Sequence, residues 1–389
     1  MLSSLAYLFI AGLSLGYIFT RLHLPSLVGM LLAGILLGSS GLNLLDESLL
    51  GISIELRQIA LVIILLRAGL ALNLGDLKQV GRPAVLLCFV PACLEIGGVM
   101  LLAPALLGVS LLEAAVIGAV VAAVSPAVIV PKMLGLMEQG RGTSKGIPQM
   151  IMAGGSIDDI FVIVLFTAFT TLAAGGEVSG AALLNIPFSI LLGAGVGVVA
   201  GVLLSEFFKR AQMRDTIKLI VMISCSLLFL TLEAALKETI ALSGLLAVMV
   251  MGITMLWRYP TLAKRLSPKL NKVWVGAEVV LFVLVGASVN IEYAAAAGFT
   301  PALLILLVLI FRMVGVWLST TRTQLNSRER LFSMIAYTPK ATVQAAIGSI
   351  PLAMGLPCGE IVLTVAVLSI IITAPLGAFG IDLTSRFLE

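Results

Sequence analysis

The chain has 389 residues, of which 60% are hydrophobic and only 11% are charged, and its formal net charge is +4. Soluble domains carry about 25% charged residues, so this composition excludes a water-soluble enzyme, a disordered chain and a disulfide scaffold. The mean hydropathy of +1.16 and continuous apolar runs such as "LLILLVLIF" (303–311) are typical of membrane-spanning helices rather than of alternating barrel strands. The sequence therefore predicts an all-α polytopic membrane protein.

Residues that could hold a cofactor or a nucleic acid are sparse. The four cysteines lie apart in apolar stretches and the single histidine, His23, lies in a predicted loop, so neither type has the spacing of a metal cluster. Basic residues occur in short loops without interleaved aromatic residues. We therefore expect no cofactor and no nucleic-acid partner.

Thirteen apolar segments follow one another along the chain, and most approach the roughly 20 residues that a helix needs to cross the hydrocarbon. They leave no room for a folded extramembrane domain. We interpret the first as a membrane span rather than a signal peptide, because no basic region precedes it. The approximate limits are 4–20, 26–45, 52–72, 84–107, 111–137, 146–174, 184–207, 216–236, 239–257, 272–291, 300–320, 331–354 and 359–381.

The charges in the connecting loops alternate in sign along the chain. Loops after odd-numbered segments are basic, as at Lys209, Arg210 and Arg214, whereas loops after even-numbered segments are acidic, as at Asp46 and Glu47. Cytoplasmic loops of membrane proteins carry the excess of lysine and arginine. We therefore predict that the N-terminus lies outside and the C-terminus in the cytoplasm. As part of the functional hypothesis below, we expect a multi-pass protein of a bacterial-type inner (plasma) membrane.

Two of the segments carry a hydroxyl residue before a proline near their middle. Ser125-Pro126 interrupts the segment 111–137, and Thr338-Pro339 interrupts the segment 331–354. If 184–207 is a linker, the chain has two six-helix halves, and each interrupted segment is fifth in its half and crosses in the opposite direction. Matched, broken helices in inverted repeats indicate the midplane binding site of a transporter.

Ionisable side chains at membrane depth are costly and mark binding sites or ion pathways. Five lie near the middle of their segments: Glu95, Asp158, Asp159, Arg312 and Lys340. Three carboxylates against two cations leave one negative charge, which is unfavourable in a buried site unless a positive partner joins it. A proton or a monovalent cation would serve, and the two would compete. That competition is the minimal physics of a cation/proton exchanger.

The adjacent aspartates point about 100° apart on a helix, so they face different surroundings. One can rest on a lysine while the other, Asp159, alternates between proton and ion. A hard alkali cation prefers oxygen ligands, which Asp158, Asp159, the Ser125 hydroxyl and carbonyls near Pro126 could supply. The partial charges at the free ends of the broken helices could be offset by Lys340 and by carboxylates.

Five stretches of the chain resemble the cation/proton antiporter superfamily, and most closely its paired-aspartate sodium/proton antiporters, the NHA-type branch of the second family. They run in order across most of the chain and together are highly specific. The stretches are "LLRAGLAL" (65–72), "AVSPAVIVPKML" (123–134), "GIPQMIMAGGSIDDI" (146–160), "VLFVLVGASV" (280–289) and "TPKATVQAAIG" (338–348).

The resemblance implies roles for individual residues. Asp159 is similar to the essential ion- and proton-carrying aspartate, and Asp158 to its partner. Arg312 stands where many relatives have a lysine, and is similar to an arginine bridged to a glutamate that matches Glu95. Because arginine does not release its proton, the two protons per cation that the lysine-bearing relatives imply are disfavoured, and an electroneutral one-for-one cycle is an alternative; the sequence leaves the stoichiometry open.

The resemblance also implies an elevator-like transporter with a role in pH homeostasis. We expect a homodimer in contact with membrane lipids, in which an ion-binding core moves against a scaffold. The expected division is 1–83 (scaffold, first half), 84–183 (core, first half), 184–215 (linker helix), 216–299 (scaffold, second half) and 300–389 (core, second half).

The leading hypothesis is exchange of Na⁺ or Li⁺ for H⁺, with K⁺/H⁺ exchange as the alternative. An ion channel is a remote alternative, because the chain lacks a TVGYG-like filter. An organic-anion symporter is equally remote, since an acid-lined core would repel its substrate. An intramembrane enzyme is disfavoured by the absence of HExxH, GxSxG and Walker-type sequences.

Overall fold

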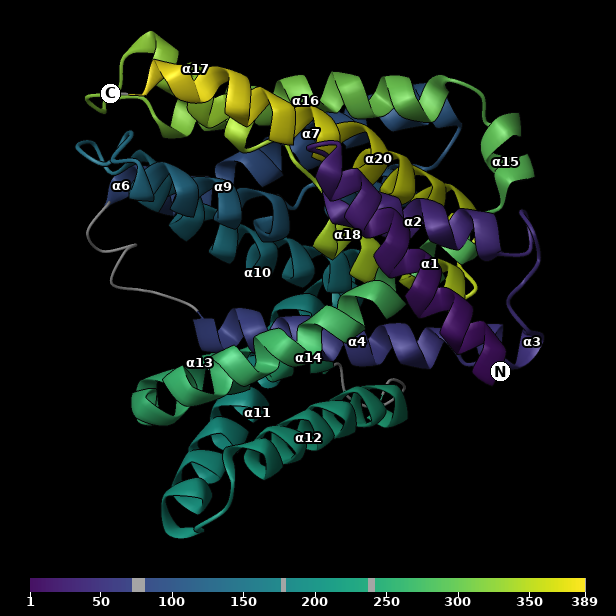
Figure 1. Cartoon of the computed structure of the whole chain (residues 1–389), viewed down its shortest axis with the longest axis vertical. Helices are drawn as coiled ribbons and strands as arrows, with labels where there is room; N and C mark the ends of the chain where they lie inside the picture. The colour runs from purple at the N-terminus through teal and green to yellow at the C-terminus, as the bar shows by residue number, and fades with distance from the viewer. Residues whose placement is uncertain (72–80, 176–179, 237–241, 389) are drawn as a thin grey trace. The chain divides into compact units, whose positions relative to one another are not determined.

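The computed structural model describes residues 1–71, 81–175, 180–236 and 242–388, and within these residues it contains helices and no strand (Figure 1). The predicted segments 52–72 and 239–257 extend by a few residues outside the described part. The chain divides into two compact units, which are considered one at a time below.

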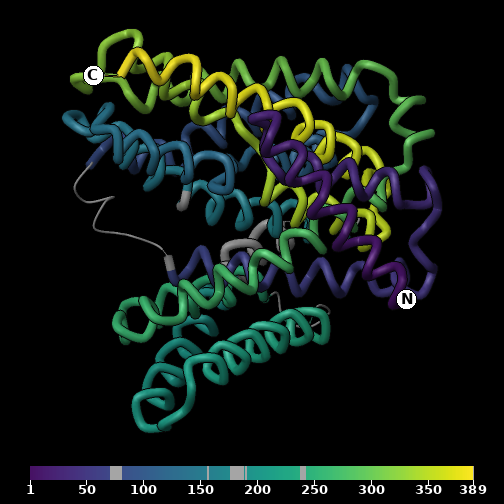
Figure 2. The backbone as a smooth tube through the Cα atoms, in the orientation of Figure 1, coloured from purple at the N-terminus to yellow at the C-terminus, as the bar shows by residue number. Residues whose placement is uncertain are grey.

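Unit 1 comprises Met1–Ile54, Asn73–Ala173 and Val279–Glu389. Its first two helices lie side by side (Figures 1 and 2), and α20 packs against helices from both parts of the unit that follow them. The helices are α1 (Leu2–Arg21), α2 (Ser26–Leu37), α3 (Glu47–Leu50), α6 (Arg82–Leu87), α7 (Val90–Leu107), α8 (Leu111–Val121), α9 (Pro126–Glu138), α10 (Ile147–Ala174), α15 (Ile291–Ala296), α16 (Thr300–Ser319), α17 (Ser327–Ala336), α18 (Thr342–Ile347), α19 (Ile350–Ala353), α20 (Gly359–Thr384) and η1 (Ser385–Phe387).

Unit 2 comprises Glu55–Leu72 and Ala174–Glu278. It holds most of α4 (Ser53–Ala71), α11 (Gly180–Arg210), α12 (Asp215–Leu236), α13 (Gly244–Arg258) and the larger part of α14 (Pro260–Ala287). The last residues of α14 belong to unit 1.

Small residues let the backbones of α11 and α13 approach closely in unit 2. A Cβ atom on Gly193 would lie 2.5 Å from the carbonyl oxygen of Ser243, and one on Gly197 would lie 2.6 Å from that of Ala247. Glycines four residues apart occupy the same helix face, and such spacing permits close helix packing in membranes. The seam therefore depends on the absence of side chains at these positions.

Both predicted helix interruptions are present in unit 1. Helix α8 ends at Val121 and α9 begins at Pro126, while α17 ends at Ala336 and α18 begins at Thr342. Proline lacks an N–H and disfavours helical geometry in the residue before it, which explains why the break precedes Pro126. The backbone N–H of Ser125 donates to the carbonyl oxygen of Pro339 at 2.8 Å. The two breaks therefore lie against each other.

The prediction of an all-α, multi-span chain is confirmed. Among the described residues, nine helices are long and apolar enough to cross a membrane, and three shorter apolar helices accompany them at 26–37, 244–258 and 342–353. Each of the thirteen predicted segments overlaps one or more of the helices. The exact number of spans and the inverted repeat remain predictions.

Two predicted boundaries are wrong. The segment 26–45 ends as a helix at Leu37, because the residues that follow turn at Gly38 and Gly41. The segment 272–291 begins as a helix at Pro260, since the charged residues Lys264, Arg265 and Lys269 lie on α14 rather than in a loop. Charge ends an apolar segment but does not end a helix.

Replacing Gly197 with valine should destabilise unit 2. The new side chain would collide with the backbone of α13 and cost about 1–3 kcal/mol or more, as for overpacked cores, and the melting temperature in detergent should fall. Gly195→Val is the matched control on the same helix, because a Cβ at Gly195 meets nothing within 4 Å. Equal melting temperatures for the two variants would contradict the close packing of α11 against α13 at Gly197.

Candidate functional site

The helices that carry Glu95 and Arg312 are brought together by glycines one turn away from each charge. Helices α7 and α16 pack along much of their length. A Cβ on Gly315 would lie 2.5 Å from the Cα of Pro91, and one on Gly98 would lie 2.7 Å from the ring of Phe311. The close approach therefore places the two charged side chains opposite each other.

All five central charges are buried, and four of them form one ion-pair network. Arg312 Nη1 lies 2.9 Å from Glu95 Oε2, and Arg312 Nη2 lies 2.9 Å from Asp158 Oδ2. Lys340 Nζ lies 2.6 Å from Glu95 Oε1. Each of these four side chains has 0% exposure. The expected contact between Glu95 and Arg312 is confirmed.

The expectation that one aspartate rests on a lysine is wrong. The ammonium of Lys340 pairs with Glu95, whereas the guanidinium of Arg312 contacts Asp158. A guanidinium presents several donors in a planar fork and can serve two carboxylates at once, which a point-like ammonium does less well. Arg312 therefore occupies the place between Glu95 and Asp158.

The cations also satisfy backbone carbonyls at the end of α8. The last carbonyls of a helix have no partner within it, and cations near them are favourable because they oppose the helix dipole. In this structure three consecutive carbonyls each accept a hydrogen bond from a side chain. The pairs are Val121 with Lys340 Nζ, Ala122 with Arg312 Nη1, and Ala123 with Gln344 Nε2 at 2.8 Å.

The same pattern occurs beside the other interruption. Arg312 Nε donates to the carbonyl oxygen of Tyr337 at 2.6 Å, just past the end of α17. On the anionic side, the N–H of Val124 donates to Asp158 Oδ2 at 2.9 Å, before the start of α9. The expectation that Lys340 and carboxylates offset the free helix ends is thus confirmed, and Arg312 takes part as well.

Asp159 stands apart from this network. The residue is 8% exposed, and among the described residues it makes no ion pair, while its Oδ1 has no hydrogen-bond partner. The Ser125 hydroxyl is likewise buried and has no hydrogen-bond partner in the described part of the chain. Since the other two carboxylates are matched by the two cations, the excess negative charge of the site falls on Asp159.

The remaining predicted residues shape the backbone. Pro126 is the first residue of α9, and the carbonyl of Pro339 holds the N–H of Ser125. The Thr338 hydroxyl donates to the carbonyl of Ile335 at 2.8 Å and so is used within its own segment. Neither proline nor Thr338 contributes to the ion-pair network through its side chain.

Sequence reasoning missed two residues of the site. The ring of Tyr337 lies 5.2 Å from the guanidinium carbon of Arg312, and its hydroxyl donates to the carbonyl of Leu87 at 3.1 Å. Gln344 caps α8, as described above. A lone glutamine in the apolar run after Lys340 was a readable signal, whereas a single tyrosine is typical of an ordinary core.

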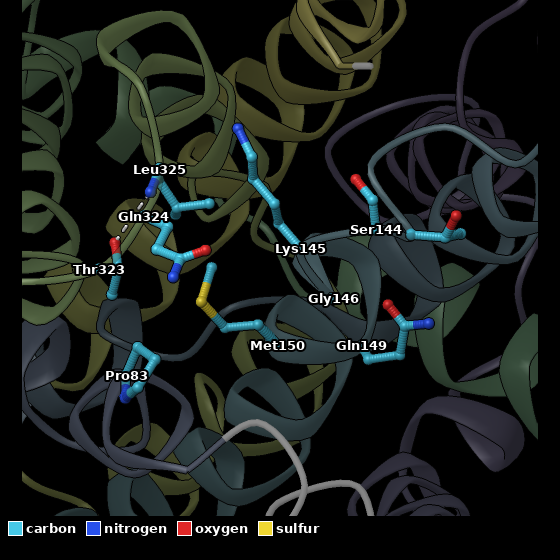
Figure 3. Close-up of a pocket in the computed structure, with 10 residues that line it drawn as sticks. Pro83, Ser144, Lys145, Gly146, Gln149, Met150, Thr323, Gln324 and Leu325 are labelled. Atoms are coloured by element: carbon cyan, nitrogen blue, oxygen red, sulfur yellow. Dashed lines mark hydrogen bonds between the residues drawn. The ribbon is translucent and has the colours of Figure 1, made fainter.

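A pocket of about 520 Å³ lies in unit 1 (Figure 3). It is lined by Pro83, by residues 143–146, by the first turn of α10 and by residues 323–325. Lys145 at its edge pairs with Glu329, with Nζ 2.7 Å from Oε1. None of the central charges lines this cavity, so it is separate from the ion-pair network.

A family model described as "Sodium/hydrogen exchanger, transmembrane" matches residues 5–384. The chain belongs to this family. It is therefore an integral multi-pass membrane protein of the cation/proton antiporter superfamily, whose members transport ions, and the expected class of transporter is confirmed.

Individual exchangers are similar to the chain over nearly its whole length. Sodium/hydrogen exchanger 9B2 of Mus musculus is 36% identical over 376 residues, which is 92% of this chain and 68% of the relative. The Homo sapiens protein of the same name is 36% identical over 380 residues, covering 92% and 69%. The sodium proton antiporter MjNhaP1 of Methanocaldococcus jannaschii has the same fold, with a TM-score of 0.82 at 20% identity and coverage of 99% and 98%.

Replacing Glu95 with alanine should destabilise this exchanger strongly. Lys340 would lose its ion-pair partner while fully buried, and removal of one member of a buried pair typically costs about 3–5 kcal/mol. The melting temperature of the purified protein measures the loss. Glu206→Ala is the control, because Glu206 pairs with Lys209 and Arg258 but is 39% exposed, and it should change stability little. If the Glu95 variant were as stable as that control, the buried ion pairs of Glu95 would not stabilise the fold.

Proposed function

We propose that the chain exchanges Na⁺ or Li⁺ for H⁺ across a membrane, with Asp159 binding cation and proton in turn. The observation that carries this proposal is the contrast between Asp159 and the other buried charges. Glu95 and Asp158 are held by Arg312 and Lys340, whereas Asp159 has no such partner among the described residues. A buried, uncompensated carboxylate favours either a proton or a cation beside it.

Oxygen atoms near the helix breaks provide the ligands in this proposal. Besides Asp159, Asp158 Oδ1 and the Ser125 hydroxyl are buried and have no hydrogen-bond partner within the part of the chain that the structure describes, and such orphaned atoms call for an explanation. An alkali cation prefers oxygen ligands. Protonation of Asp159 would remove the charge that holds the cation, so that the two ions exclude each other.

Transport then requires the loaded site to face one side of the membrane and then the other. We assign the motion to the residues 84–183 and 300–389 as an elevator-like core, against a dimeric scaffold formed by 1–83 and 216–299, with 184–215 as a linker. The orientation has the C-terminus in the cytoplasm. The basic loops after odd-numbered segments support this orientation.

Arg312 favours an electroneutral cycle. Its guanidinium is engaged by two carboxylates and two carbonyls, and arginine stays protonated in proteins. Lys340 is committed to Glu95 and to the end of α8. One carboxylate, Asp159, is then left to exchange one proton for one cation.

Asp159→Asn should abolish coupled exchange. Asparagine has no charge to trade between proton and ion, so a Na⁺ gradient should no longer drive proton movement in proteoliposomes loaded with a pH-sensitive dye. Asp382→Asn is the control, because Asp382 is exposed and pairs with Lys132 at the end of α20, and it should transport normally. Na⁺-driven proton flux in a folded Asp159 variant would refute the proposed site.

The unmodified protein should exchange Na⁺ or Li⁺ for protons at a rate that does not change when a membrane potential is imposed. A one-for-one cycle moves no net charge, so a K⁺/valinomycin potential has nothing to act on. Each alkali cation is tested in turn in the same vesicles. Stimulation by the potential would contradict the one-for-one stoichiometry, and exchange of K⁺ alone would identify the chain as a potassium/proton exchanger.

A further inference from the structure

The peptide group between Ala123 and Val124 forms hydrogen bonds on both sides with side chains from two different helices. Its carbonyl oxygen accepts from Gln344 Nε2 at 2.8 Å, and its N–H donates to Asp158 Oδ2 at 2.9 Å. A trans peptide is planar, with its C=O and N–H pointing in opposite directions. Gln344 of α18 and Asp158 of α10 are therefore joined through a single rigid group.

The orientation of the Gln344 amide is fixed by its surroundings. Its Nε2 faces the carbonyls of both Ala123 and Val121, the latter at 3.4 Å. The reverse orientation would place Oε1 against two carbonyl oxygens, so the amide nitrogen is the atom that must point there. The residue has 0% exposure, and its Oε1 has no hydrogen-bond partner among the residues that the structure describes. Gln344 thus keeps one acceptor unsatisfied in order to hold this backbone.

The tilt of the peptide matters because it lies in the break between α8 and α9, where the helical ladder is interrupted. Asp158 Oδ2 accepts from Val124 on one side and from Arg312 Nη2 on the other. Donation into the carbonyl of an amide also polarises its N–H and strengthens the next hydrogen bond in the chain. Gln344 therefore acts on both the position and the strength of the bond that Asp158 receives.

We propose that Gln344 is a positioning residue for Asp158, acting through the peptide group between Ala123 and Val124. The absence of charge on the Gln344 amide matters for this role. Two of the three carbonyls at the end of α8 are capped by cations, Lys340 and Arg312, and a third cation would cancel the one negative charge that attracts the transported ion. An amide supplies the donor without the charge. The inference rests on the proposed function, in which Asp158 contributes to cation binding.

Gln344→Met tests this role, since methionine has a similar length and no N–H. With one donor removed, we expect the apparent KM for Na⁺ in proteoliposomes to rise about five- to tenfold, with a smaller change in maximal rate. Gln344→Asn, which keeps the amide but withdraws it by one methylene, should give a smaller rise and serves where the methionine variant does not fold. Ser369→Ala is the control, because among the described residues this buried hydroxyl of α20 donates to Ala366 of its own helix and to no other group.

A double-mutant cycle separates positioning from ordinary packing. If Gln344 acts through Asp158, the losses of melting temperature in Gln344→Met and Asp158→Asn should be non-additive in the double variant, whereas those of Ser369→Ala and Asp158→Asn should add. Additive losses, or an unchanged KM in the Gln344 variants, would overturn the inference. Normal transport by Asp158→Asn would instead overturn the role of Asp158 in the proposed function.

Discussion

The fully buried guanidinium of Arg312 is the interaction on which the rest of the site depends. It reaches carboxylates on α7 and α10 and backbone carbonyls beside both helix breaks. Each of these groups would be costly to bury alone. Because one planar side chain satisfies all of them, the two interrupted helices and the two acidic helices share a single point of attachment.

This arrangement separates two tasks that a transport site has to perform. The network of Arg312, Lys340, Glu95 and Asp158 gives each of its charged groups an oppositely charged partner and suits a fixed framework. Asp159 follows Asp158 in the sequence but makes no ion pair with the network among the described residues, and it is slightly exposed. In the proposed cycle the framework keeps its partners while the adjacent carboxylate changes its own, so that binding and release do not require the core to be rebuilt.

Much of the fold was readable from the sequence because hydropathy and proline act locally. The apolar segments, the breaks before Pro126 and near Pro339, and the five central charges could all be located without a structure. The pairing of those charges could not, since Arg312 and Glu95 are 217 positions apart and their contact depends on how α7 and α16 pack. The same holds for Tyr337 and Gln344, whose roles exist only once carbonyls at the breaks are left without helical partners. The choice among alkali cations is set by small differences in ligand spacing, which residue types do not encode.

Glu329, a buried carboxylate outside the ion-pair network, also has two partners. The Glu329 side chain is almost fully buried, with 1% exposure. It accepts a hydrogen bond from the backbone N–H of Asn326 at the start of α17, and it forms an ion pair with Lys145 just before α10 begins. The N-terminal ends of α17 and α10 are therefore linked by one ion pair. A shift of either helix along its axis would separate Lys145 from Glu329, so this ion pair ties the register of the aspartate-bearing helix α10 to that of α17.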